Sequence, residues 1–131
     1  MINYLKRKET PSETKIYKEI IKNPETDEVL FILCIELKES LFLWLSNHID
    51  ANFNNLALSM KSIKDIIPIS SLLLGEIVQD EYTIQLSKRL AKKYNKMFFV
   101  STNLISKSDE ISSFHSTELA LKKYLDTIIV D

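Results

Sequence analysis

The sequence predicts an α+β fold, in which an antiparallel β-sheet of about six strands packs against two main α-helices. The strands are predicted by short runs that are rich in branched and aromatic residues, the types that strands favour. The helices are predicted by two longer stretches whose apolar residues recur at the spacing of one helix face. With 131 residues, 45% of them hydrophobic and 27% charged, the chain has the size and composition of one globular domain.

The N-terminal part consists of a polar segment followed by the start of the domain. We expect residues 1–14, which are polar and charged, to be flexible, and residues 15–131 to form a single domain. Residues 15–23 fit either a short strand or a helical turn. Pro24, with Asn and Asp close by, predicts a turn over residues 23–28.

The clearest strand pattern is a pair of apolar runs, EVLFILCIEL at residues 28–37 and SLFLWLS at residues 40–46. Only the dipeptide Lys38-Glu39 separates them. Such a short gap predicts a tight hairpin, although Lys-Glu is not a preferred turn pair.

Three more strands are expected along the chain. Residues 55–61 alternate between apolar and small or polar residues. Residues 66–74 include Pro68, which cannot donate to a strand ladder and therefore belongs at a strand start, an edge or a bulge. Residues 97–104, MFFVSTNL, complete the set.

Gly75 is the only glycine of the chain and follows the run IPISSLLL. A loop that wraps a phosphate needs several closely spaced glycines, so a single one does not indicate such a site. We expect Gly75 to end a strand, where the chain turns or adopts a positive φ.

Two amphipathic helices follow from the spacing of apolar residues. In residues 82–96, Leu86, Leu90 and Tyr94 recur every four residues, with acidic residues before the stretch and lysines at its end. Residues 117–130 carry a second stripe, made by Leu121, Tyr124, Leu125, Ile128 and Ile129.

Composition and motifs argue against catalysis. Cys34, the single cysteine, lies in an apolar run and is expected to be a buried, inert thiol. His48 and His115 both fall in expected loops, and no metal-ligand spacing or nucleophile motif accompanies them. We therefore expect a protein that is not an enzyme and that needs no cofactor or metal.

Charge and hydropathy limit the partners and the location. The net charge is −1 and the pI about 6.1, so the chain lacks the basic excess typical of proteins that bind nucleic acid or anionic membranes. No signal-peptide core or membrane-length apolar run occurs. We expect the cytoplasm as its location, with the nucleus as an alternative.

The hairpin runs are apolar on both faces instead of alternating, which indicates that both faces are covered. Two helices can cover one side of the sheet. The other side requires either a partner or a sandwich in which the sheet folds over its own hairpin. Phe31, Leu33, Phe42 and Trp44 are the residues that we expect at a dimer contact or in internal packing.

A basic face is expected on the helix over residues 82–96. Lys88, Arg89, Lys92 and Lys93 form either a solvated surface or a docking site for an acidic partner. A nucleic-acid module remains a rival hypothesis, and it predicts binding that depends steeply on salt.

Four segments resemble the proteasome assembly chaperone 4 family. They are ESLFLWLS at residues 39–46, NLALSM at 55–60, IPISSLLLGE at 67–76 and QLSKRLAKKYNKMFFVSTNL at 85–104. Each is similar to a motif of the family, in the same order and at similar spacing, and Gly75 occupies the family's glycine position. The loop over residues 46–54 looks long by comparison.

The resemblance implies a non-enzymatic chaperone subunit. Such a chain pairs with a partner of the proteasome assembly chaperone 3 type and promotes assembly of the α-subunit ring of the 20S proteasome. We expect such a chain to form the heterodimer through its sheet residues and to present either loops or the basic helix face to proteasome α subunits. A homodimer in the absence of the partner remains open. The alternative is a dimeric adaptor of the roadblock or longin type that serves small GTPases or trafficking complexes.

Overall fold

The computed structural model describes residues 14–22, 28–50, 52–61, 68–105 and 112–129. The expected flexible segment, residues 1–14, lies outside these ranges except for Thr14. The secondary structure runs, in chain order, β1 (Lys15–Lys22), β2 (Val29–Glu36), β3 (Ser40–Ser46), β4 (Leu56–Met60), β5 (Ile69–Leu74), α1 (Glu81–Tyr94), β6 (Met97–Asn103) and α2 (Ser112–Ile128).

The strands form one six-stranded sheet in the order β1-β2-β3-β6-β4-β5. This confirms the predicted α+β class, but the sheet is mixed and not antiparallel throughout, because β3 and β6 pair in parallel. Parallel neighbours need a long crossover connection. Here the chain supplies one by building β4, β5 and α1 before it returns beside β3.

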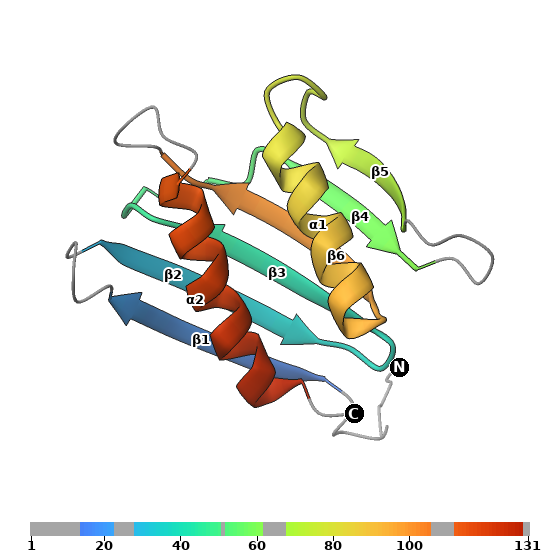
Figure 1. Ribbon diagram of the computed structural model, residues 1–131, viewed down its shortest axis with the longest axis horizontal. Helices are drawn as coiled ribbons and strands as arrows, with labels where there is room; N and C mark the ends of the chain where they lie inside the picture. The colour runs from blue at the N-terminus through green and yellow to red at the C-terminus, as the bar shows by residue number, and fades with distance from the viewer. Residues whose placement is uncertain (1–13, 23–27, 51, 62–67, 106–111, 130–131) are drawn as a thin grey trace, which may run out of the picture.

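Both helices cover the same side of the sheet (Figure 1). Between this side and the helices lies one buried core. Its fully or almost fully buried side chains come from β2, β3, β6 and both helices, and include Ile32, Leu43, Leu90, Phe98 and Leu125. The six strands do not fold into a second layer within the ranges that the structure describes, so the sandwich alternative is wrong for this part of the chain.

Residues 15–22 form a strand, which resolves the ambiguity between strand and helical turn. They pair with β2 along their whole length, from Lys15 opposite Glu36 to Lys22 opposite Val29. Tyr17 points to the helix side, and its hydroxyl donates to the Glu36 carboxylate at 3.1 Å. The alternate residues, Ile16 and Ile20, point to the other side of the sheet and stay exposed.

The predicted hairpin is confirmed. β2 and β3 pair antiparallel, and Lys38 and Glu39 lie in the bend between them. The turn is closed by the Leu37 N–H, which donates to the Ser40 carbonyl at 2.9 Å. This bond holds the two strands in register without an Asn-Gly or Asp-Gly pair.

Gly75 ends β5 with a φ of +121°, as expected, a value that side chains rarely tolerate. A Cβ at this position would also overlap the Asp80 carboxylate. That carboxylate accepts from the Glu76 N–H at 2.8 Å and from the Asn55 side-chain amide at 2.8 Å. The glycine thus lets a compact loop form between β5 and α1. Pro68 directly precedes β5, which confirms its expected place at a strand start.

The two helices lie where the apolar spacing placed them, with shifted ends. α1 stops at Tyr94, two residues before the expected end, because Asn95 adopts the left-handed conformation (φ 56°) and its N–H caps the Ala91 carbonyl at 2.9 Å. α2 begins at Ser112, before the expected start at residue 117, and ends at Ile128, so His115 lies in this helix and not in a loop as expected. Leu121 and Leu125 are fully buried, which confirms the core stripe.

Candidate protein-binding site on the uncovered sheet face

The side of the sheet opposite the helices forms a largely apolar surface, here called the open face. Strand residues alternate between the two sides. Ile32 and Leu43 point to the helices, and their sequence neighbours on β2 and β3 point to the opposite side. The side chains of the open face are half-buried or exposed in the chain alone, and those on the central strands include Phe31, Leu33, Ile35, Phe42, Trp44, Leu58 and Phe99.

One apolar row crosses five strands of this face in register. Ile16 lies opposite Ile35, Ile35 opposite Phe42, Phe42 opposite Phe99, and Phe99 opposite Leu58. Cross-strand neighbours of this kind touch through their side chains. A continuous apolar band of this length is unusual for a surface that stays in water, and it is typical of a protein-binding site.

The four residues expected at the contact all lie on the open face. Leu33 is paired with Trp44, and Phe42 and Phe31 occupy the rows on either side. None of the four belongs to the core cluster between the sheet and the helices. The structure therefore places them away from the main packing and on one continuous surface; their role in dimer contact stays a prediction.

Sequence reasoning missed several members of this face, among them Ile16, Leu58, Phe99 and Phe53. Phe99 could have been found from its alternation with the buried residues Phe98 and Val100. Phe53 gave no such signal, because it lies in the connection between β3 and β4. Its ring packs on Phe42, with 6.2 Å between the ring centroids.

The basic face of α1 is partly engaged within the chain. Arg89 forms an ion pair with Glu118 of α2 at 2.7 Å, and its guanidinium also lies over the Tyr82 ring at 5.8 Å. Lys93 approaches Asp126 at 4.0 Å. Arg89 thus ties α1 to α2, whereas the exposed pair of Lys93 with Asp126 contributes little to this contact. The other two predicted basic residues, Lys88 and Lys92, are half-buried and exposed, respectively.

Glu118 is the centre of the contact between α1 and α2. Glu118 is only 8% exposed. Its carboxylate accepts hydrogen bonds from Arg89 and from the Tyr82 hydroxyl, the latter at 3.2 Å, and forms an ion pair with Lys122 at 3.1 Å. Burial raises the pKa of Glu118, but hydrogen bonds from Arg89 and Lys122 outweigh burial and leave it below its usual value. The pKa of Tyr82 is raised, first by burial and then by the Glu118 charge. The cluster is thus a satisfied structural network.

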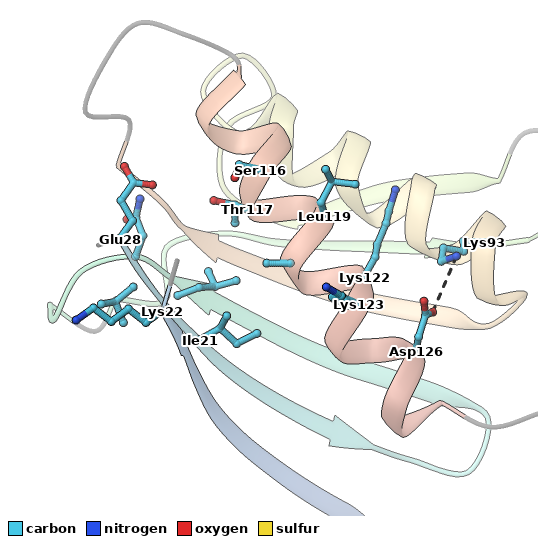
Figure 2. Close-up of a pocket in the computed structure, with 14 residues that line it drawn as sticks. Ile21, Lys22, Glu28, Lys93, Ser116, Thr117, Leu119, Lys122, Lys123 and Asp126 are labelled. Atoms are coloured by element: carbon cyan, nitrogen blue, oxygen red, sulfur yellow. Dashed lines mark ion pairs between the residues drawn. The ribbon is translucent and has the colours of Figure 1, made fainter. Parts of the chain in front are cut away.

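A cavity of about 740 Å³ flanks α2 from Ser116 to Asp126 (Figure 2). Its floor is apolar and includes Ile21 and Leu30, and its rim carries lysines and acids. Figure 2 shows Lys93 turned toward Asp126 across its edge. Lys122, also on the rim, pairs with Glu118. Lys93, Lys122 and Asp126 are thus engaged in ion pairs within the chain.

In the described part of the chain, the single thiol is buried and the possible metal ligands do not cluster. Cys34 is fully buried, as predicted, and burial, followed by the nearby Glu36 carboxylate, raises the pKa of its thiol to about 12. Over the ranges that the structure covers, His, Cys, Asp and Glu side chains form no group of three that could hold a metal ion. Among the helices in these ranges, none is long and apolar enough to cross a membrane.

Comparisons with known proteins agree with this geometry. A structural neighbour is a chain in the crystal structure of a novel chaperone complex for yeast 20S proteasome assembly, with a TM-score of 0.64 over 88% of this chain and 95% of that one. Sequence identity with it is 11%, so this likeness supports the fold alone.

Two relatives match in sequence. Human proteasome assembly chaperone 4 is 40% identical and the mouse protein 36% identical, each over 78 residues. The match covers 60% of this chain and 61% of each relative, so it spans less than two thirds of their length. The family model of proteasome assembly chaperone 4 matches residues 29–104, which contain β2 to β6 and α1. The chain therefore belongs to the proteasome assembly chaperone 4 family.

Proposed function

We propose that this chain is a non-enzymatic chaperone subunit that pairs with a chain of the proteasome assembly chaperone 3 type and promotes assembly of the α-subunit ring of the 20S proteasome. The observation that carries the proposal is the open face, an apolar band across five strands that the helices leave uncovered. Membership of the family supports the same reading. We also propose the cytoplasm as its location, with the nucleus as an alternative.

The shape of the open face fits another sheet. Two sheets pack face to face about 10 Å apart when both present apolar side chains. A partner of the same fold would supply such a surface, and burying the aromatic residues Phe42 and Trp44 would contribute most of the binding free energy. A second copy of this chain could occupy the face only when the partner is absent.

Assembly then proceeds through binding free energy alone. A chaperone dimer with its two sheets stacked keeps its helices on the outside, where they can contact other subunits. Binding that favours one neighbour over others orders an assembly pathway without a chemical step.

For the contact with α subunits we retain the basic face of α1. Lys88 and Lys92 are better candidates than Arg89 and Lys93, because the latter two pair with acids of α2. In the double variant Lys88→Glu, Lys92→Glu, we expect weaker binding of α subunits and unchanged binding of the partner chaperone. Unchanged α-subunit binding by the folded double variant would remove this contact from the proposal.

The central test compares two substitutions that each replace an apolar side chain with aspartate. Phe42→Asp places the charge in the middle of the open face. Leu119→Asp places the same charge on α2, at a residue that is 55% exposed on the opposite side of the sheet. With the recombinant partner chain, isothermal titration calorimetry should show binding lost for Phe42→Asp and retained for Leu119→Asp. Equal binding by both folded variants would refute the open face as the dimer contact.

A tagged pull-down from native cells, read by mass spectrometry, tests the pathway. The proposal expects a second small chaperone and free proteasome α subunits, with few mature β subunits. Recovery of small GTPases or trafficking proteins without α subunits would favour the adaptor alternative. Salt-sensitive recovery of nucleic acid would favour the rival that uses the basic helix.

A further inference from the structure

The connection between β3 and β4 passes around the end of β6. β6 lies between these two strands in the sheet, parallel to β3 and antiparallel to β4. The C-terminal ends of β3 and β6 and the start of β4 therefore lie at the same end of the sheet (Figure 1). Residues 47–50 and 52–55 of this connection are described, and we call them the lip; Ala51 lies outside the described part.

Hydrogen bonds hold the first half of the lip against the end of β6. The Asn47 side chain binds the main chain of Ile105 twice, donating to its carbonyl at 2.7 Å and accepting from its N–H at 2.8 Å. The Asn103 amide donates to the Asp50 carbonyl at 2.8 Å. The Ser46 hydroxyl donates to the His48 carbonyl at 2.8 Å.

The second half of the lip is held against the open face itself. The Trp44 indole donates to the Asn52 carbonyl at 2.8 Å, and the Phe53 ring packs on Phe42. The lip then ends at Asn55, which is 6% exposed. The Asn55 side-chain amide accepts from the Thr102 N–H at 2.9 Å and donates to the Thr102 carbonyl at 3.0 Å. It also donates to the Asp80 carboxylate. The lip is therefore a built structure along its described length.

This anchored loop presents apolar side chains to solvent. Phe53 is 49% exposed even though one side of its ring rests on Phe42, and Ile49 is 87% exposed. A loop that served only to shield Trp44 and Phe42 from water would turn its own apolar side chains inward. The exposure of Phe53 points to a further surface that covers it.

The open face also gains area from the lip. The Phe53 ring packs on Phe42, the central member of the apolar row, so a partner seated on the row would also meet the lip.

We infer that the lip is part of the partner-binding surface and that Phe53 is an anchor that inserts into an apolar recess of the partner chain. This inference rests on the proposed function and names the residue that extends the contact beyond the sheet. The asparagine clamps hold Phe53 in place before binding, which lowers the entropy cost of ordering a loop at an interface. The occupant is the partner chain, since the same partner must cover the adjoining row.

The test uses the full chain and the recombinant partner of the proteasome assembly chaperone 3 type, with affinities measured by isothermal titration calorimetry. Phe53→Ala should weaken binding at least about tenfold, the size expected for an aromatic anchor. Leu119→Ala, which removes an exposed apolar side chain on the opposite side, should change affinity less than about twofold. Circular dichroism and thermal unfolding confirm that each variant is folded.

A second variant tests the role of the clamps. Asn47→Ala removes both bonds to Ile105 without substituting the Phe53 side chain. If the clamps preorganise the lip, this variant should bind the partner more weakly and with a less favourable entropy. A variant that binds with wild-type affinity and entropy would overturn preorganisation.

The outcomes separate this inference from the proposed function. Loss of partner binding in Phe42→Asp with wild-type binding in Phe53→Ala would overturn the lip as an anchor and leave the function standing. Wild-type binding by Phe42→Asp and by Phe53→Ala would overturn the lip as an anchor and also the open face as the dimer contact. Tighter binding by Phe53→Ala would identify the lip as a cover that competes with the partner, which contradicts the inference. A Phe53→Ala variant that keeps partner binding but loses self-association, as measured by sedimentation, would also contradict the inference.

Discussion

Arg89 of α1 holds Glu118 of α2 through two hydrogen bonds, from Nε to Oε2 at 2.7 Å and from Nη2 to Oε1 at 2.8 Å. The two residues are 29 positions apart, and the pair ties together the helices that cover the core. Hydrogen bonds between a guanidinium and a carboxylate are charge-assisted and fix the relative orientation of both groups. The pair is therefore a structural element of the helix layer, although Arg89 had been expected at a surface for α subunits.

The first prediction concerns the strength of this pair. Arg89→Ala should lower the free energy of unfolding by about 1–2 kcal/mol, because Glu118 is buried and loses two donors while Lys122 remains beside it. Urea unfolding followed by circular dichroism measures the change. Lys92→Ala, at an exposed lysine of the same helix, should change stability by less than about 0.5 kcal/mol. Equal effects of the two variants would contradict a structural role for Arg89.

The pKa of Glu118 yields a prediction for pH. The folded chain lowers the pKa of Glu118, so its contribution to stability is complete above the unfolded value of about 4.3 and is lost as pH falls through the lower folded value. Glu118→Gln should be less stable than wild type near neutral pH, and its stability should fall less steeply in the acid range. Urea titrations at a series of pH values measure both slopes. Arg89→Ala should flatten the slope too; a wild-type slope in both variants would contradict the assignment.

Gly75 provides a third test, on backbone strain. Gly75→Ala should cost about 1–3 kcal/mol, because alanine resists a φ of +121° and its Cβ overlaps the Asp80 carboxylate. Ser71→Ala, at an exposed residue of β5, is the control. Adding Asp80→Ala removes the overlap but not the strained φ, so the double variant should lose less than the sum of the single variants. Strict additivity would show that the overlap contributes nothing.

The periodic features of the fold were predictable from the sequence. The alternation in the strands and the four-residue spacing in the helices depend on local geometry, so the hairpin around Lys38-Glu39 and the core stripe of Leu121 and Leu125 followed directly. The parallel pairing of β3 with β6 did not, because it depends on which strands meet after α1 has crossed over. The helix ends shifted for a local reason, the left-handed conformation of Asn95.

The candidate site was predictable only in part. The sequence singled out Phe31, Leu33, Phe42 and Trp44 as a region of contact or packing, but both runs are apolar on both sides and do not show which side faces the helices. The pairing of β2 with β3 and the burial of the alternate residues place all four on one face. The ring contact of Phe53 with Phe42 depends on how a polar loop folds back, and no residue pattern encodes it. The pairing of Arg89 with Glu118 likewise arises from the packing of two helices, which a basic stripe on one helix does not reveal.

The last prediction separates the core from the open face. Leu43 and Phe31 lie on adjacent strands and point to opposite sides of the sheet, and Leu43 is fully buried under the helices. Leu43→Ala should cost about 2–5 kcal/mol in the isolated chain, since it leaves a cavity in the core. Phe31→Ala should cost the isolated chain less than about 1.5 kcal/mol, because its ring is half-exposed there.

The partner chain should affect the two variants in the opposite order, because Phe31→Ala impairs partner binding more than Leu43→Ala does. A partner that binds only the folded chain raises its apparent stability. In urea unfolding at low protein concentration, excess partner should stabilise Leu43→Ala by nearly as much as wild type and should stabilise Phe31→Ala much less. If Phe31→Ala instead destabilises the isolated chain as much as Leu43→Ala does, the open face is packed within the chain itself, and a partner is not needed to cover it.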